Sequence, residues 1–126
     1  MGKSLGKKLF SLAKTSLGEL MVGIAFARFS KYLPIKRLKE TDKVVAFWHP
    51  KPFWQKHILL VPKKPIKSLR HLKKEDNEYL SEVFKLAGEL VDELGWENEG
   101  YTLLVNGGKR QEVAQLHFHL CAGSEL

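Results

Sequence analysis

The chain has a single cysteine, Cys121, only five prolines, and no long uninterrupted apolar segment. One cysteine excludes an intramolecular disulfide, fits a reducing compartment and leaves no cysteine pair for a zinc ribbon. No apolar run approaches the roughly 18 residues that indicate a membrane-spanning helix. The rest of the composition, 44% hydrophobic and 28% charged over 126 residues, is typical of one globular domain with a modest core.

The net charge of +7 is confined to one end of the chain. Residues 1–43 contain ten Lys and Arg against three acidic residues, whereas residues 44–126 contain eleven of each. A general polyanion-binding surface would spread its basic residues over the folded domain. The distribution therefore argues against a specific nucleic-acid partner.

Residues 1–30 differ in composition and apolar pattern from residues 31–126, which we expect to form the folded domain. Apolar residues recur at helical spacing between lysines: Leu5, Leu9, Leu12, Leu20 and Ile24. This pattern predicts a basic amphipathic helical arm that could lie on an anionic membrane as a peripheral contact. The same residues loosely fit a signal peptide, a myristoylation start at Gly2, or a helix packed on its own domain or across a dimer.

An α+β domain is expected after Pro34. The β-rich runs are residues 44–48, 57–61, 101–105 and 116–122, and the short loop between the first two suggests an antiparallel pair.

A long amphipathic helix is expected between the second and third of these runs. Glu75, Asp76 and Glu78 are placed in its first turn, where carboxylates favour the positive end of the helix dipole, and Gly95 is its C-terminal stop. Its expected apolar stripe is Leu80, Val83, Phe84, Ala87, Leu90, Val91 and Leu94.

Two histidines one residue apart carry the most specific chemical signal. Side chains alternate along a strand, so Gln115, His117 and His119 are expected to share one face. If an acceptor holds the Nδ1 proton of His117, its Nε2 lone pair is free to attack phosphorus. A His-x-His pair alone is also typical of two polar side chains at a protein surface, or of two zinc ligands.

The order of several motifs resembles the histidine triad (HIT) superfamily. The motifs are Val45-Ala-Phe-Trp-His-Pro, His57-Ile-Leu-Leu-Val-Pro-Lys-Lys, Ile66-Lys-Ser-Leu, the long helix, Leu104-Val-Asn-Gly-Gly, and the closing Gln115-x-His117-x-His119. The resemblance covers residues 34–124. It implies a five-stranded antiparallel sheet with helices, often assembled as a homodimer.

The resemblance also implies an activity: hydrolysis or transfer at the α-phosphate of a nucleotide or nucleotide-like conjugate, without an obligatory metal or other cofactor. His117 matches the nucleophile, His119 the partner of the phosphate oxygens, and His57 the upstream histidine near the leaving group. Gln115 occupies the first triad position. The candidate nucleotide-binding residues are Phe47, His49, Leu59, Asn106, Glu112 and Val113.

Two positions depart from the family pattern. Gln115 stands where the first triad histidine is found, and glutamine cannot carry a proton at neutral pH, which weakens any relay to the leaving group. His49 stands where nucleotide-binding members have an aspartate that accepts both ribose hydroxyls.

Two rival functions stay open beside a cytoplasmic enzyme. One is a nucleotide- or phosphate-binding module without turnover. The other is a membrane-tethered adaptor. The aromatic residues Trp48, Phe53 and Trp54 could stack on a base or be buried in the core or a dimer contact.

Overall fold

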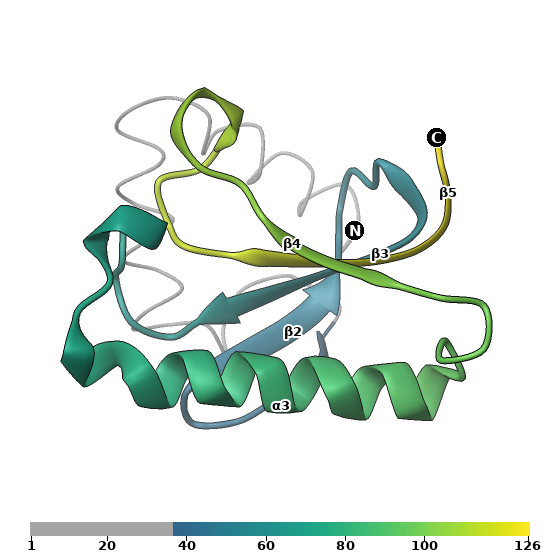
Figure 1. Ribbon diagram of the computed structural model, residues 1–126, viewed down its shortest axis with the longest axis horizontal. Helices are drawn as coiled ribbons and strands as arrows, with labels where there is room; N and C mark the ends of the chain where they lie inside the picture. Colours follow the sequence, from purple (N-terminus) through teal and green to yellow (C-terminus); the bar gives the residue numbers. More distant parts are fainter. Residues whose placement is uncertain (1–36) are drawn as a thin grey trace.

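The computed structural model describes residues 37–126. The predicted N-terminal arm, residues 1–30, lies outside this range, so its helix and its membrane contact stay predictions. Five strands form one antiparallel sheet in the order β1-β2-β3-β5-β4 (Figure 1). The strands are β1 (Arg37–Glu40), β2 (Val44–Trp48), β3 (Trp54–Pro62), β4 (Thr102–Val105) and β5 (Phe118–Glu125). The α+β fold with its five-stranded sheet agrees with the prediction.

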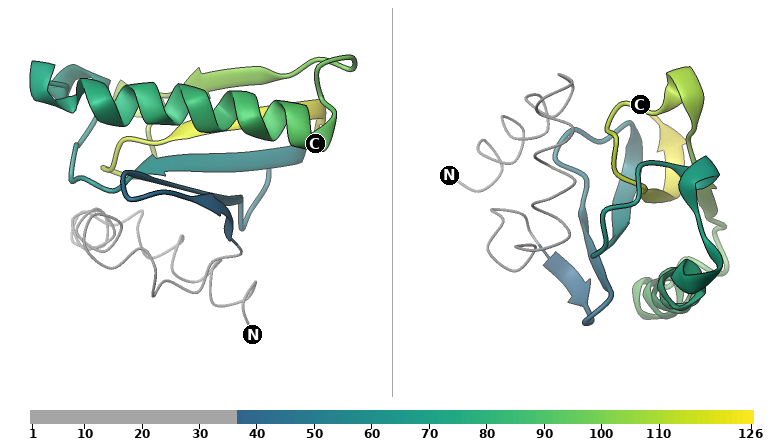
Figure 2. Two further views of the ribbon diagram at one scale, coloured as in Figure 1. Left: turned by 90° about the horizontal axis from the view of Figure 1, so that it is seen from below. Right: turned by 90° about the vertical axis from the view of Figure 1, so that its left-hand side faces the viewer.

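One long helix, α3 (Asn77–Leu94), crosses a single face of the sheet (Figure 2). Within residues 37–126 there are also three short 3₁₀ turns: η2 (Leu69–His71), η3 (Lys74–Asp76) and η4 (Gly108–Arg110). The helix ends at Gly95, whose φ of 71° is the left-handed conformation that glycine adopts without a steric penalty. No helix within residues 37–126 combines the length and apolar character that crossing a membrane requires.

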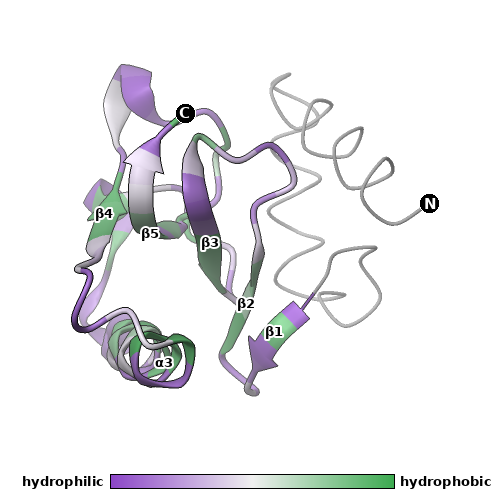
Figure 3. Cartoon of the chain, turned by 90° about the vertical axis from the view of Figure 1, so that its right-hand side faces the viewer, coloured by the Kyte–Doolittle hydropathy of each residue, from purple (hydrophilic) through white to green (hydrophobic). Residues whose placement is uncertain are grey.

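The main core lies between α3 and the sheet. β2, β3 and β5 send alternate side chains toward the helix, and hydrophobic colouring marks much of β2 and β4 (Figure 3). The buried members are Val44, Ala46, Ile58, Leu60, Ile66, Val83, Leu86, Ala87, Leu90, Val91, Trp96, Leu116, Phe118, Leu120 and Ala122.

The opposite face of the sheet carries a second, smaller apolar cluster and the histidines. Its apolar residues are Val45, Phe47, Leu59 and Val61. Because side chains alternate along a strand, His57 shares this face with Leu59. His119 pairs with Leu59 across β3 and β5, so it belongs to the same face. The sheet therefore separates the helix-packed core from the histidines.

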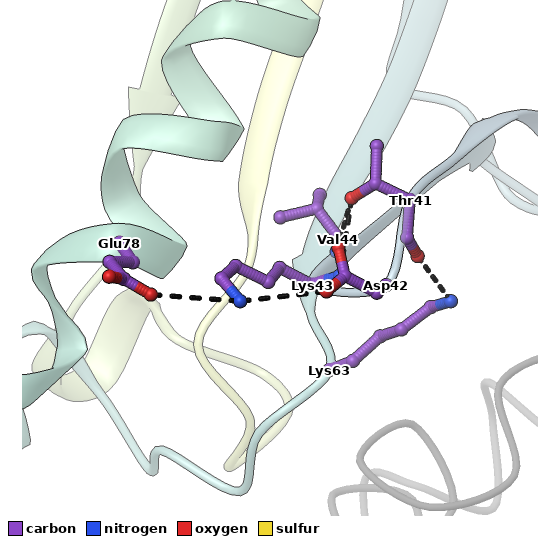
Figure 4. Close-up of polar contacts among 6 residues, drawn as sticks. All are labelled: Thr41, Asp42, Lys43, Val44, Lys63 and Glu78. Carbon is purple, nitrogen blue, oxygen red and sulfur yellow. Dashed lines mark hydrogen bonds and ion pairs between the residues drawn. The ribbon is translucent and has the colours of Figure 1, made fainter.

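Polar contacts link the turn between β1 and β2 to its neighbours (Figure 4). The Thr41 hydroxyl accepts hydrogen bonds from the backbone N–H groups of Lys43 and Val44, at 3.2 and 3.1 Å. Nζ of Lys43 lies 3.7 Å from the Glu78 carboxylate near the start of α3, and Nζ of Lys63 donates to the Thr41 carbonyl. These contacts join the turn to the first residues of α3 and to Lys63, which follows β3.

Several predicted boundaries were wrong. β1, a short strand at the edge of the described sheet, was not predicted. The last strand begins at Phe118, so Gln115 and His117 precede it in an irregular segment. Glu75 and Asp76 lie in η3, before α3 begins, because the chain turns through a 3₁₀ segment first.

The predicted stripe of α3 is correct except at its margins. Phe84 is 58% exposed and Leu94 is 37% exposed, while Leu86, which the stripe omitted, is buried. The Phe84 ring lies beside that of Phe118, with centroids 6.2 Å apart, and stays largely exposed. The face of α3 that packs on the sheet is therefore rotated slightly about the helix axis from the face that the apolar periodicity predicted.

Candidate active site

A cavity of about 210 Å³ opens on the sheet face that carries the histidines. It is lined by His49, Phe53, Trp54, His57, Leu104, Asn106, Arg110, Glu112, His117, His119, Cys121 and Glu125. Four histidines from the β2–β3 loop, β3 and the region of β5 therefore meet in one place. All four are buried.

His117 is held in one orientation by its own chain. Its Nδ1 lies 2.6 Å from the backbone carbonyl oxygen of Gln115. A carbonyl only accepts, so Nδ1 must carry the proton and donate, which leaves the lone pair on Nε2. Burial lowers the pKa of His117, although the Gln115 carbonyl and the Glu112 charge act in the opposite direction. The side chain is thus a neutral imidazole with a free nitrogen at the cavity.

His57 and His119 form a directed hydrogen-bonded pair. Nδ1 of His57 accepts the backbone N–H of Phe53 at 3.0 Å, so its proton sits on Nε2. Nε2 of His57 lies 2.8 Å from Nδ1 of His119 and donates to it. The proton of His119 is therefore on Nε2, a buried atom without a hydrogen-bond partner among the described residues. Such an N–H is available to a ligand oxygen.

His49 is oriented in the same way as His57. Its Nδ1 accepts the backbone N–H of Lys51 at 2.9 Å, which places its proton on Nε2. Its ring centroid lies 4.4 Å from that of His57 and 6.1 Å from that of His119. Phe53 meets the His49 ring edge-on at 5.4 Å. The three rings form a compact group.

This group stays uncharged at neutral pH. Burial, reinforced by the neighbouring histidines, lowers the pKa of His49 to about 3. Burial and His117 lower the pKa of His57 to about 4, and burial with His117 and His57 lowers that of His119 to about 3. The group therefore offers N–H dipoles and no positive charge.

The same three histidines have the spacing of a metal site. One ring nitrogen from each of His49, His57 and His119 lies within 4.8 Å of the others. A metal needs the lone pair of a deprotonated nitrogen, however. The hydrogen bonds from Lys51 and Phe53 place protons on the Nε2 atoms of His49 and His57. The observed orientations therefore fit hydrogen-bond donation better than metal ligation.

Gln115 has a structural role at its position. Its side-chain Nε2 donates to the carbonyls of Pro62 and Lys64 at 3.1 and 2.9 Å, and its Oε1 accepts from the N–H of Ile66 at 3.3 Å. The side chain is 1% exposed and does not line the cavity. Neutral imidazole has one donor and one acceptor, so it cannot make all three bonds. Gln115 joins the chain after β3 to the segment that carries His117.

The remaining predicted residues divide into two groups. Asn106 and Glu112 line the cavity, as does His49. Phe47, Leu59 and Val113 are buried but do not line it. The assignment of all six to nucleotide binding stays a prediction.

Sequence reasoning missed several residues that line the cavity. Arg110, in the turn before the triad, is a cation that its place after Gly107-Gly108 could have indicated. Glu125 and Leu104 carried no such signal. Cys121 also lines the cavity, and burial raises the pKa of its thiol to about 11, so it stays protonated. The backbone N–H groups of Lys51 and Phe53, which fix two histidine tautomers, cannot be identified from side-chain patterns.

Comparison with known proteins shows the family of the chain. The family model "HIT domain" matches residues 31–126, so the chain belongs to the HIT family. A HIT-like protein of Helicobacter pylori is 30% identical over 95 residues, covering 74% of this chain and 88% of that protein. A HIT-like protein of Azospirillum brasilense is 32% identical over 105 residues, covering 80% and 86%.

Solved structures show the same fold. A histidine triad protein from Clostridium difficile superposes with a TM-score of 0.74 at 30% identity, covering 83% of this chain and 91% of that one. A HIT family hydrolase from Legionella pneumophila gives 0.73 at 27% identity, covering 79% and 91%.

Proposed function

We propose that this protein is a HIT-type nucleotidyl hydrolase or transferase that acts at the α-phosphate of a nucleotide or nucleotide-like conjugate. The observation that carries the proposal is the hydrogen bond from Nδ1 of His117 to the Gln115 carbonyl, because it leaves the Nε2 lone pair of a neutral imidazole at the cavity. Membership of the HIT family and the likeness to a HIT family hydrolase support the choice of reaction.

The reaction has two steps. Nε2 of His117 forms a bond to phosphorus while the bond to the leaving group breaks, and the leaving group keeps the electron pair and takes a proton from solvent water. A water molecule or another hydroxyl acceptor then attacks the phosphorus, loses its proton to solvent, and the electron pair of the broken P–N bond returns to Nε2 of His117. The Nε2–H of His119 donates to a phosphate oxygen as negative charge develops, and His57 holds His119 in the donating tautomer.

The second candidate is a phosphate-binding module without turnover. It is favoured by Gln115, because the first triad position provides no titratable group and its amide is fully engaged by backbone atoms. The N–H donor of His119 would still bind a phosphate oxygen in such a module.

Covalent labelling separates the two candidates. The full chain is incubated with a panel of nucleoside phosphoramidates and dinucleoside polyphosphates, quenched in alkali and digested for mass spectrometry. We expect a nucleotidyl group on His117, its loss in His117→Ala, and its retention in His71→Ala, which removes a histidine outside the cavity. Unchanged turnover in a folded His117→Ala protein would contradict the proposal. If the protein binds a nucleotide conjugate but shows neither labelling of His117 nor turnover, the result supports the phosphate-binding module.

We also propose a homodimer, as in many family members. β4 is an edge strand of the described sheet, and an exposed edge can pair with another chain. Light scattering of the full chain tests this assembly: a mass of one chain at high concentration would exclude it.

A further inference from the structure

Two loops of the domain are strongly basic. Residues 63–74 contain six Lys and Arg and no acidic residue, and Lys109 and Arg110 follow in η4. Residues 75–99, which include α3, contain nine acidic residues and one lysine. The neutral total of residues 44–126 therefore hides a separation of charge, with most of the cations in the two loops.

The two loops lie against each other beside the cavity. Nε2 of Gln111 donates to the carbonyl oxygen of Lys67 at 2.7 Å, which joins the residues after η4 to the loop after β3. Lys67, Lys109 and Arg110 are exposed, and none of them has an ion pair with a carboxylate of residues 37–126. Arg110 also lines the cavity that holds His117. The three cations form a basic surface next to the proposed nucleophile.

The described part of the cavity has no imidazolium that could protonate a leaving group at neutral pH. The side chain of Gln115 is bound by three backbone groups and does not line the cavity. Burial lowers the pKa values of His57 and His119 to about 4 and about 3, so both are neutral imidazoles that donate hydrogen bonds without releasing a proton. A departing amine needs a proton, whereas a departing phosphate is stable as an oxyanion. The cavity therefore favours leaving groups that depart as anions.

We propose that the basic surface binds the phosphates beyond the scissile bond, so that the substrates are phosphoric anhydrides, nucleoside or dinucleoside polyphosphates, in place of phosphoramidates. The inference rests on the proposed function, since His117 and His119 place the α-phosphate. The Arg110 guanidinium presents paired N–H donors that match two oxygens of the next phosphate. Lys67 and Lys109 add positive charge for the phosphates that follow.

The anhydride reaction needs no acid from the protein. Nε2 of His117 bonds to the α-phosphorus while the bond to the bridging oxygen breaks, and that oxygen keeps the electron pair on the departing phosphate chain. Water then attacks the phosphorus, loses a proton to solvent, and the electron pair of the P–N bond returns to Nε2. Arg110 stabilises the negative charge that the departing oxygen gains.

The carboxylates at the cavity do not cancel this attraction. Glu112 and Glu125 line the cavity, and both are exposed. Their repulsion of a phosphate chain acts through water and is screened by salt, and the basic surface has three cations against these two acids. The chain is expected on the side of Arg110, away from the two carboxylates.

Binding of two unreactive nucleotides tests the basic surface without turnover. AMP and α,β-methylene-ADP differ by the second phosphate, and neither contains an anhydride bond that could be cleaved. Calorimetry with the full chain in EDTA should show α,β-methylene-ADP bound at least about tenfold more tightly than AMP, the effect of a paired charge-assisted contact.

Variants at position 110 assign the difference to one side chain. Arg110→Ala should reduce the ratio to less than about threefold, since single exposed charges such as the two lysines contribute little. Arg110→Lys keeps the charge without the paired donors and should give an intermediate ratio. Lys85→Ala removes an exposed cation from α3 and should keep the wild-type ratio.

Turnover compares leaving groups on the same nucleotide. The substrates are ATP, diadenosine triphosphate and adenosine 5′-(N-butyl)phosphoramidate. For the wild-type chain, kcat/KM of the better anhydride should exceed that of the phosphoramidate by at least about a hundredfold, the usual contribution of one proton donor. The better of the two anhydrides identifies whether the phosphate chain ends freely or in a second nucleoside.

The outcomes are distinct from those of the labelling experiment. Equal binding of AMP and α,β-methylene-ADP, absence of binding for both, an unchanged ratio in Arg110→Ala, or a phosphoramidate cleaved at least as fast as both anhydrides overturns the inference. None of these results affects labelling of His117 by other conjugates. The expected binding ratios without labelling or turnover would instead reject the catalytic proposal and keep the basic surface as a phosphate-binding site.

Discussion

Nδ1 of His117 donates to the carbonyl oxygen of Gln115, two residues earlier, across 2.6 Å. The residue that departs from the triad pattern thus orients the proposed nucleophile through its backbone, while its side chain joins the same segment to the loop after β3. Position 115 therefore has a structural role in this protein, and its backbone carbonyl orients His117.

The four buried histidines should divide into two tautomers. His117 is expected as the Nδ1–H form, and His49, His57 and His119 as the Nε2–H form, because of the hydrogen bonds at their Nδ1 atoms. Long-range ¹H–¹⁵N correlation spectra of the protein in EDTA at pH 7 distinguish the forms. An Nε2–H tautomer at His117 would remove the basis for its nucleophilic role.

The two triad histidines should differ in their contribution to turnover. His117→Ala is expected to lower kcat/KM by at least about a thousandfold, because the attacking atom is lost. His119→Ala should lower it by about a hundredfold, the typical effect of one donor to developing charge. Steady-state rates on a substrate found by labelling provide the test, with circular dichroism to confirm folding. Equal losses in the two variants would argue against the separate roles.

Restoring the family residue at position 115 should reduce stability. Gln115→His leaves at least one of the three backbone partners unsatisfied in a buried site, at a cost of about 1–3 kcal/mol in the free energy of unfolding. Urea denaturation measures the change. Gln111→Leu is the matched control, since Gln111 also donates to two carbonyls but is partly exposed, and it should cost less. A Gln115→His protein as stable as wild type would contradict the structural role.

The buried histidines should make the fold sensitive to mild acid. Their pKa values in the folded state, about 3 to 4 for three of them, lie below the value near 6.5 of an unfolded chain. Between these values the unfolded chain binds more protons than the folded protein does. The free energy of unfolding is therefore highest, as far as these histidines contribute, above pH 6.5, and it falls as the pH is lowered toward 4. Each histidine adds at most about 1.4 kcal/mol per pH unit.

Denaturation at pH 7, 6, 5 and 4.5 in EDTA checks this slope. His49→Gln should show a shallower one, because it removes one of these groups. Stability that stays constant from pH 7 to pH 5 would show that the histidines are protonated in the folded protein.

The basic arm is predicted to bind anionic membranes, although it lies outside the described residues. Exchanging Lys3, Lys7, Lys8 and Lys14 for Glu in the full chain should abolish co-sedimentation with anionic vesicles, since each lysine near the surface adds about 1 kcal/mol. Binding of the wild-type chain should also weaken as salt is raised. Equal binding by both chains would contradict an attachment through these lysines, and no binding by the wild type would exclude membrane attachment.

The sequence by itself determined the family, the α+β class, four of the five strands and the central histidines. Repeating apolar patterns and motif order are local properties, so β2, the body of α3 and the Gly95 stop could be predicted closely. The short β1 could not, because a four-residue strand with a mixed pattern is defined by its pairing with β2 and not by its own residues.

Only the tertiary structure decided what the departures from the motif do. Position 115 looked like a catalytic position, yet three backbone partners from residues 62–66 bind its side chain. His49 stands where the family pattern has an acceptor, yet the backbone N–H of Lys51 occupies its Nδ1 and leaves the proton on Nε2. A histidine's tautomer depends on which backbone groups the fold brings within hydrogen-bonding distance, and residue order alone does not specify those neighbours.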